Sequence, residues 1–499
     1  EEDRRMDSPI IRVGIVQNAP KIKISLLGNS YIYAGDKEVH LSGDKKLEVK
    51  VLQSKNPKVV YRVVTKELKE LANPSEMEKY KIIRVGKKVE FSGKLISDNR
   101  KYWVCIGDFE KRKIAEEAFE KINGISIIED FIGEKGGIVK ITDSKGKEVV
   151  EGDIIRIKST HPMTIFDVLV GEGFHFEHKE TQSFKEWLEF RVNNYGGLVA
   201  INELPVEDYL ASVNSSESNP DSPLELLKAQ TVIARGTVFA TIGKHHFNDS
   251  YDLCNNDHCQ NYKGLVRETP RAKEASSLTR GEVLKYGKEI CDTRYAAICG
   301  GITEDYQNVW FGEKIPYLST IIDAKKPDGV IRFYPATSEE NARRFIDSTP
   351  DAWCNIINWK IPDYLKNVEG FRWNISYSKD ELGEIIKKKT GRDIGILIDI
   401  VPLKRGNSGR IMLLEVKGTK SAFRIRSELS IRMALSPSCL LSSCFYVKKD
   451  EKSITLYGAG WGHGVGMCQI GGSIMAHNGI KHDEILMHYF KGTKIEKIY

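Results

Sequence analysis

The chain has 499 residues, of which 40% are hydrophobic and 29% are charged, a composition typical of a globular protein with several domains. Its 75 basic and 69 acidic residues give a net charge of only +6, and the two signs are interspersed along the chain. This mild balance argues against nucleic-acid binding, which usually needs a clustered basic surface. No apolar run is long enough to predict a membrane span.

The first residues of the chain and its cysteines give little evidence of processing or of disulfide cross-links. The chain begins with EEDRR, which does not resemble a signal peptide, so we expect a mature or trimmed form. Nine cysteines are present, and an odd number in a long chain does not indicate a disulfide framework.

The first part of the chain is predicted to be rich in β-strands. Residues 9–77 contain short runs of β-forming residues separated by Gly, Asn and Asp, and a second such region covers 134–195. The rest, 196–499, mixes helix and strand patterns and contains an inserted α+β segment at about 325–430. We therefore predict an α+β protein whose β-rich N-terminal part leads into a mixed catalytic region.

A different pattern lies between the two β-rich regions, at 78–133. A predicted strand at 102–107 is followed by an amphipathic helix at 111–122 and a returning strand at 124–128. The apolar face of the helix would consist of Ile114, Ala118 and Ile122. The segment resembles one half of a SPOR domain, a module that binds bare glycan strands. An inserted structural module is the alternative.

Two predicted helices follow Pro205, with Glu217 in the polar linker between them. Pro205 suits a first helical position, and Ser222 with Glu225 predicts a capping box for the second helix. A carboxylate in such a linker can point into a cleft, although most loop glutamates are simply solvated. Lys228 and Arg235 lie two turns apart on one face of the second helix, where the alternative is an exposed polar stripe.

Three ordered blocks of motif residues extend over about 300 residues. The first contains EDYL at 207–210, SE at 216–217 and LKAQ at 227–230 followed by AR at 234–235. The second contains GGITE at 300–304, VW at 309–310 and PYL at 316–318. The third is GWGHGVGMCQIG at 460–471, and ILMHYFKGT follows at 485–493.

These blocks resemble the SpoIID/LytB family, which is named after stage II sporulation protein D and an amidase enhancer. The sequence departs from the family pattern at Cys299 and Cys468, where the family usually has Ser, and at 218–220, where it usually has Met-Pro. The resemblance implies an extracytoplasmic enzyme, secreted or anchored through a removed N-terminal segment. It implies lytic cleavage of peptidoglycan glycan strands that lack stem peptides.

The resemblance assigns Glu217 as the catalytic residue. A glycosidic bond breaks when an acid protonates the leaving oxygen. In a lytic transglycosylase the same carboxylate then takes the proton of the sugar's own C6 hydroxyl, which leaves a 1,6-anhydro end. Glu217 must therefore be protonated at first, which requires partial burial. The predicted substrate-binding residues are Lys228, Arg235, Tyr306, Trp310, Trp461 and His463.

Two further assignments carry alternatives. His463 lies between glycines that permit close approach to a ligand, but it could equally close the loop with a structural hydrogen bond. The family also contains amidase enhancers, so a non-catalytic protein that binds peptidoglycan and acts with an amidase is the second hypothesis. A metal-dependent hydrolase is the third.

A group of histidines and cysteines predicts zinc. His246, Cys254, His258 and Cys259 would supply two imidazoles and two thiolates, a tetrahedral set. Some relatives in the resembled family carry a similar cluster. The alternatives are a Cys254–Cys259 disulfide or free thiols. Four protein ligands leave no position for water, so we expect a structural zinc, and no organic cofactor is expected.

Overall fold

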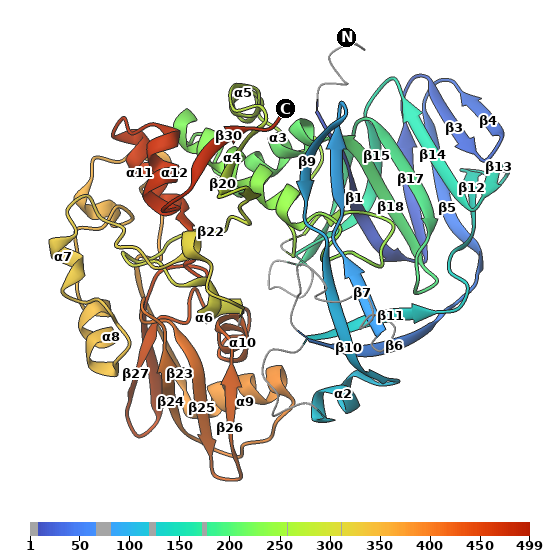
Figure 1. Cartoon of the computed structure of the whole chain (residues 1–499). Helices are drawn as coiled ribbons and strands as arrows, with labels where there is room; N and C mark the ends of the chain where they lie inside the picture. The colour runs from blue at the N-terminus through green and yellow to red at the C-terminus, as the bar shows by residue number, and fades with distance from the viewer. Residues whose placement is uncertain (1–7, 66–80, 119–125, 172–176, 257, 311) are drawn as a thin grey trace.

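The computed structural model describes residues 8–65, 81–118, 126–171, 177–256, 258–310 and 312–499 (Figure 1). About 23% of the protein is helical and 39% is strand, which confirms the predicted α+β class with a β-rich N-terminal part. None of the helices in the described ranges is long and apolar enough to cross a membrane.

Two antiparallel-rich sheets pack against each other in the N-terminal half. Strand β2 (Lys21–Leu26) illustrates why: Ile22, Ile24 and Leu26 are buried, while Lys21 and Lys23 are exposed. The seven-stranded sheet has the order β19 (Leu253–Cys254), β1 (Ile10–Ala19), β18 (Leu198–Pro205), β17 (Trp187–Val192), β14 (Ile154–Ser159), β3 (Ser30–Ala34) and β4 (Lys37–Leu41). The six-stranded sheet has the order β13 (Glu148–Gly152), β12 (Gly137–Asp143), β5 (Lys45–Ser54), β2, β15 (Met163–Val170) and β16 (His178–Phe184).

A four-stranded antiparallel sheet forms the insert in this half. Its order is β11 (Ser126–Ile132), β6 (Lys58–Val64), β10 (Lys101–Phe109) and β7 (Lys81–Val85), with helix α2 (Arg112–Ala118) beside it and the hairpin β8 (Lys88–Phe91) and β9 (Lys94–Asp98) following β7. The insert therefore includes β6, which lies before the predicted boundary at residue 78. The predicted apolar helix face was also wrong, because Ile114 is 49% exposed and Ala115 is the buried residue. Ile122 lies outside the described residues.

Three helices lie between the β-rich N-terminal half and the C-terminal elements (Figure 1). They are α3 (Val206–Glu217), α4 (Leu224–Thr241) and α5 (Pro270–Leu278). Helix α4 is buried on nearly all sides, since Ala234, Val238 and Phe239 belong to the core of the β-rich half and Leu226, Val232 and Ile233 belong to the C-terminal core. A helix that is apolar around its whole circumference is expected to be buried in this way.

Glu217 is the last residue of α3, and the prediction that it lies in a linker was wrong. Asn214 donates to the carbonyl of Leu227 at 2.7 Å, and the hydroxyls of Ser215 and Ser216 donate to backbone carbonyls four residues earlier. These bonds let a polar run remain helical up to Glu217. The predicted cap at Ser222 is also absent, because Pro223 occupies the N-cap of α4 without a side-chain bond.

The C-terminal half consists of two parts, of which the first packs against helix α4. The first contains β20 (Glu282–Tyr286), β21 (Glu289–Ile290), β22 (Tyr295–Ala296), α6 (Tyr306–Trp310), η2 (Pro316–Leu318), β29 (Met467–Cys468), α11 (Gln469–His477), α12 (His482–Tyr489) and β30 (Lys494–Lys497). The second contains α7 (Asp328–Ile331), α8 (Glu339–Ile346), η3 (Ile356–Asn358), η4 (Asp363–Leu365), β23 (Arg372–Ser378), α9 (Lys379–Thr390), β24 (Leu397–Arg405), β25 (Ile411–Gly418), β26 (Ala422–Arg426), α10 (Glu428–Ala434), β27 (Phe445–Lys449) and β28 (Ser453–Ala459). Because β23 pairs with β28, the inserted segment extends well past the predicted end at residue 430.

Candidate functional site

Glu217 is half-buried at the end of α3 and lines a pocket of about 560 Å³. Its Oε1 atom accepts a hydrogen bond of 3.0 Å from the backbone N–H of Asn261. Its own carbonyl accepts one of 3.0 Å from the side chain of Gln469. The exposed Arg267 lines the same pocket. The Asn261 N–H thus holds one oxygen of the carboxylate, Gln469 holds the backbone of the same residue, and the side chain lines a space that is open to ligand.

Gln469 connects the sequence motifs to one another. It is the first residue of α11, directly after the glycine-rich loop, and its amide lies 3.5 Å from Oε1 of Gln230 on α4. Gln469 therefore joins the end of α3, at Glu217, to the residue that follows the glycine-rich loop, and it also contacts the middle of α4. Sequence reasoning did not select Gln469, although it belongs to the third motif block, and it could not find Asn261, which contributes only a backbone N–H.

Two aromatic side chains of α6 form a group with the ring of His463. The rings of Tyr306 and Trp310 stack with centroids 5.0 Å apart, and Trp310 meets the ring of His463 edge-on at 4.9 Å. Trp310 remains 39% exposed, and the guanidinium of Arg294 lies 5.2 Å from its ring centroid. The structure thus brings three of the six predicted substrate-binding residues into one group, and Arg294 is a member that the sequence did not reveal.

His463 makes the loop-closing hydrogen bond considered as its alternative role. Its Nδ1 atom accepts from the N–H of Val465 at 3.0 Å, which places the imidazole proton on Nε2. Burial of the ring lowers the pKa of His463 to about 3, and the nearby cations Arg294 and Arg410 act in the same direction. The imidazole is therefore neutral at physiological pH and can act as a hydrogen-bond donor, but not as a titrating acid.

Trp461 and Lys228, two further predicted substrate contacts, differ in how far they are exposed. Trp461, on the same loop as His463, is 45% exposed and available to a ligand. Lys228 is directed to a carboxylate of its own helix, because its Nζ atom lies 3.1 Å from Glu225, and only 16% of its side chain is exposed. Glu225 also accepts from His482, so it does not cap α4 as predicted.

Arg235 is not a substrate contact, and this prediction is corrected. Its side chain is fully buried and forms a two-pronged ion pair with Glu207, with nitrogen–oxygen distances of 3.0 and 2.6 Å. Glu207 also accepts hydrogen bonds from Ser276 and Tyr499. Burial by itself would raise the pKa of Glu207, but Arg235 and these donors outweigh it and hold that pKa below its ordinary value.

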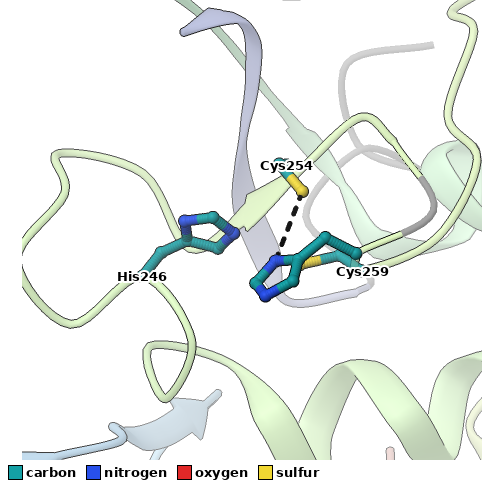
Figure 2. Close-up of side chains that lie close together, drawn as sticks. His246, Cys254 and Cys259 are labelled. Atoms are coloured by element: carbon teal, nitrogen blue, oxygen red, sulfur yellow. Dashed lines mark hydrogen bonds between the residues drawn. The ribbon is translucent and has the colours of Figure 1, made fainter. Parts of the chain in front are cut away.

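The four predicted metal ligands come together in space. One ligand atom from each of His246, Cys254, His258 and Cys259 lies within 4.8 Å of the others. The Nδ1 atom of His258 is 3.9 Å from Sγ of Cys254 and 4.0 Å from Sγ of Cys259. Figure 2 shows His246, Cys254 and Cys259 turned toward a common point. Both thiols are free, so no disulfide joins them.

The hydrogen bonding and electrostatics of this cluster suit a bound cation. The Nδ1 atom of His246 bonds to Asp249 at 2.8 Å, and its Nε2 atom is buried with no hydrogen-bond partner among the described residues. The neighbouring Cys259 thiol, and after it the His246 and His258 imidazoles, hold the pKa of Cys254 well below its ordinary value, although burial opposes this. Asp249 lies three residues after His246, but the sequence analysis did not select it.

Comparison with known proteins identifies two segments. Residues 194–286 match the model of the stage II sporulation protein (SpoIID) family, and residues 304–466 match a domain of unknown function, DUF8618. An uncharacterized protein of Brachyspira hyodysenteriae is 28% identical over 299 residues, which are 60% of this chain and 68% of that protein.

Among the relatives with functional names are two proteins of Bacillus subtilis. Stage II sporulation protein D of Bacillus subtilis is 24% identical over 315 residues, which cover 60% of this chain and 76% of that protein. The amidase enhancer of Bacillus subtilis is 24% identical over 293 residues, which cover 57% of this chain but only 40% of the enhancer. The chain therefore spans less than half the length of the enhancer.

The buried ion pair gives a prediction about stability. Glu207→Gln leaves the buried guanidinium of Arg235 without its counter-charge, so the free energy of unfolding should fall by ~3–5 kcal/mol. Because the folded-state pKa of Glu207 is lowered, its stabilisation is present above the unfolded-state value and is lost as the pH falls through the folded-state pKa. Chemical denaturation at several pH values should therefore show a smaller loss of stability in acid for the variant. An unchanged stability at neutral pH would contradict this.

Proposed function

We propose that this chain is a lytic transglycosylase that cleaves peptidoglycan glycan strands, with Glu217 as general acid and then general base, since its residues 194–286 match the SpoIID family model and two relatives carry the name stage II sporulation protein D. The observation that supports this most directly is the position of Glu217. It lies in the family-matched segment, is half-buried, and lines an open pocket where two motif blocks meet. We further propose that the protein acts outside the cytoplasm in wall remodelling, including sporulation.

The surroundings of Glu217 suit both steps of the reaction. The N–H of Asn261 holds Oε1, so the transferable proton would be carried on Oε2. That proton goes to the glycosidic oxygen as oxocarbenium character builds on the sugar. The resulting carboxylate is stabilised by the same N–H and then takes the proton of the C6 hydroxyl, which attacks the anomeric carbon. One carboxyl group thus returns to its starting state and leaves a 1,6-anhydro end.

Arg267 would select strands that lack stem peptides. Removal of a stem peptide leaves a free carboxylate on the lactyl group of the sugar, whereas an intact stem converts that group to an amide. The exposed guanidinium of Arg267 lines the Glu217 pocket and can pair with such a carboxylate. Trp310 offers its exposed face to a sugar ring, since stacking with Tyr306 fixes its orientation.

The cluster of His246, Cys254, His258 and Cys259 would hold a structural zinc ion. The fit rests on the unpartnered Nε2 atom of His246, on the Asp249 carboxylate that orients this ring, and on the two free thiols. Zinc would supply a rigid cross-link here rather than an activated water. Cys259 is two residues before Asn261, so the cross-link would steady the backbone N–H that holds Glu217.

A non-catalytic role as an amidase enhancer is the second candidate. It is favoured by the similarity to a protein of that name, and residues 304–466 offer a large domain that could contact a partner. In that case the pocket would bind glycan without cleaving it, and an amidase would be the partner.

The first test replaces Glu217 by Gln, which keeps the shape of the side chain but removes its transferable proton. Release of anhydro-muramyl ends from amidase-stripped peptidoglycan, measured by mass spectrometry, should fall by ~10²–10⁴-fold, the usual loss for a general acid–base group. Binding to the same material should be kept. Near-normal release from the folded variant would refute the catalytic role.

The matched control for this test is Glu225→Gln, on the neighbouring helix. Glu225 pairs with Lys228 and His482, so its variant should lose some stability but keep activity. Activity lost only in the control would move the acid to Glu225. If the unmodified protein releases nothing but stimulates an added amidase, the enhancer hypothesis is correct.

The second test concerns Arg267. Arg267→Gln should raise the KM for stripped glycan roughly tenfold, because a hydrogen bond to a charged group contributes about 1.5–3 kcal/mol. It should leave kcat nearly unchanged and should not alter binding of strands with intact stems. Arg271→Gln is the control, since Arg271 is an exposed residue of α5 that does not line the pocket. Equal KM values for the Arg267 variant and the control would exclude the pairing.

The third test concerns zinc at the His246 cluster. Asp249→Asn should weaken zinc binding by ~10–100-fold, as expected when the partner of a ligand histidine is altered, and Cys254→Ser should remove that ion. His245→Ala is the matched control, because His245 lies next to His246 but is not part of the cluster. Competition with a chelating dye measures the affinity. Equal affinities in the Asp249 variant and the His245 control would contradict the assignment.

A further inference from the structure

A second group of potential metal ligands lies in the C-terminal core. It consists of Cys299, Asp323, Cys354 and Cys468, and one ligand atom from each lies within 4.8 Å of the others. All four residues are at most 2% exposed. Neither the glycan pocket nor the His246 cluster includes any of them. Three thiols around one carboxylate in a dry core therefore call for a physical explanation.

The distances between the ligand atoms fit a bound ion better than a disulfide. The sulfur atoms of Cys299 and Cys354 are 3.6 Å apart. Two thiolates on a tetrahedral zinc ion are about 3.8 Å apart, as follows from a zinc–sulfur bond of about 2.3 Å. A disulfide requires about 2.05 Å. The Oδ2 atom of Asp323 lies 3.1 Å from the sulfur of Cys299, so it is close enough to be a ligand of the same ion.

Neighbouring side chains hold the carboxylate of Asp323 so that its Oδ2 atom faces the sulfur atoms. Its other oxygen, Oδ1, accepts from the hydroxyl of Tyr489 at 2.9 Å and contacts Nε2 of His488 at 3.1 Å. Such outer partners are typical of metal-binding carboxylates. In the described part of the chain, His488 is the one basic side chain in ion-pair contact with Asp323. A fully buried carboxylate beside three thiols is costly unless a cation compensates it.

Backbone N–H groups point at the sulfurs. Cys468 accepts from the N–H of Cys299 at 3.2 Å and from that of Gly471 at 3.4 Å, and Cys299 accepts from the N–H of Gly301 at 3.3 Å. Donors aimed at sulfur stabilise thiolates, which are the form that binds metal. Cys468 also lies at the N-cap of α11, where the helix dipole favours negative charge.

We propose that Cys299, Asp323, Cys354 and Cys468 bind a second structural zinc ion. Three soft sulfur ligands and one carboxylate in tetrahedral arrangement are typical of zinc, and four protein ligands leave no position for water. The site is independent of the proposed glycan cleavage, since it does not include Glu217 or the His246 cluster.

The position of the ligands in the chain indicates what this ion would do. Cys299 and Cys468 lie just outside the two ends of the 304–466 domain, while Asp323 and Cys354 lie within it. The ion would therefore join the inserted domain to the core at the place where the chain leaves and returns. It would also fix the start of α11, whose first residue, Gln469, bonds to Glu217.

The test compares the zinc content of four forms of the full chain, purified without chelator and measured by elemental mass spectrometry. In Cys299→Ser/Cys468→Ser both positions carry the residue usual in the resembled family, so the variant should fold. It should contain one equivalent of zinc less than the unmodified protein. Cys444→Ser alters a buried thiol outside the cluster and should lose none. Equal zinc in the double variant and this control would overturn the proposal.

The fourth form, Cys254→Ser/Cys259→Ser, keeps the proposed site while removing the thiols of the His246 cluster. Loaded with cobalt chloride, it should take up one equivalent and show the sulfur-to-cobalt charge-transfer and tetrahedral d–d bands of a thiolate site. Absence of these bands, or a Cys299–Cys354 disulfide in non-reduced peptide maps, would also overturn the proposal. Failure of the glycan assay would leave these metal measurements unaffected, so the two hypotheses fail separately.

Discussion

The buried ion pair between Arg235 and Glu207 holds together the parts of the chain from which the site is built. The guanidinium on α4 also donates to the carbonyl of Glu282 at the start of β20. The carboxylate on α3 accepts from Ser276 of α5 and from Tyr499 at the C-terminal end. Charges removed from water in this way are stable only when every partner is present. The pair therefore fixes how α3 and α4 lie against the segments around them, and with them the end of α3 that carries Glu217.

Helix α4 transmits this constraint to both halves of the molecule. Because one of its faces belongs to the β-rich core and another to the C-terminal core, neither core can shift without moving α4. Its Gln230 lies against Gln469, and its Thr231 and Leu227 accept from Asn214 of α3. The backbone of Glu217 is thus positioned by polar contacts between rigid helices, while the N–H of Asn261 holds its carboxylate.

Local patterns in the sequence predicted the β-rich part and the helices after Pro205, because alternation and helical periodicity are decided by near neighbours. The described strands of the β-rich N-terminal part and the two helices after Pro205 lie where the patterns placed them. The errors arose where distant contacts decide. Glu217 remains helical because Asn214 bonds to another helix, and the inserted segment passes residue 430 because β23 pairs with β28. Arg235 was wrongly predicted to contact substrate because its partner Glu207 belongs to a different helix.

The two metal clusters also show that local sequence patterns do not reveal contacts between distant residues. Cys254, His258 and Cys259 belong to one loop, so their spacing in the sequence already indicated zinc. Cys299 and Cys468 are 169 residues apart, and no spacing rule connects them with Asp323 and Cys354. In the sequence they were only two departures from a motif that usually has Ser. The structure shows that these cysteines are buried beside one oriented carboxylate. A buried carboxylate among thiols is stabilised by a cation, whereas an isolated buried cysteine packs as a small apolar residue.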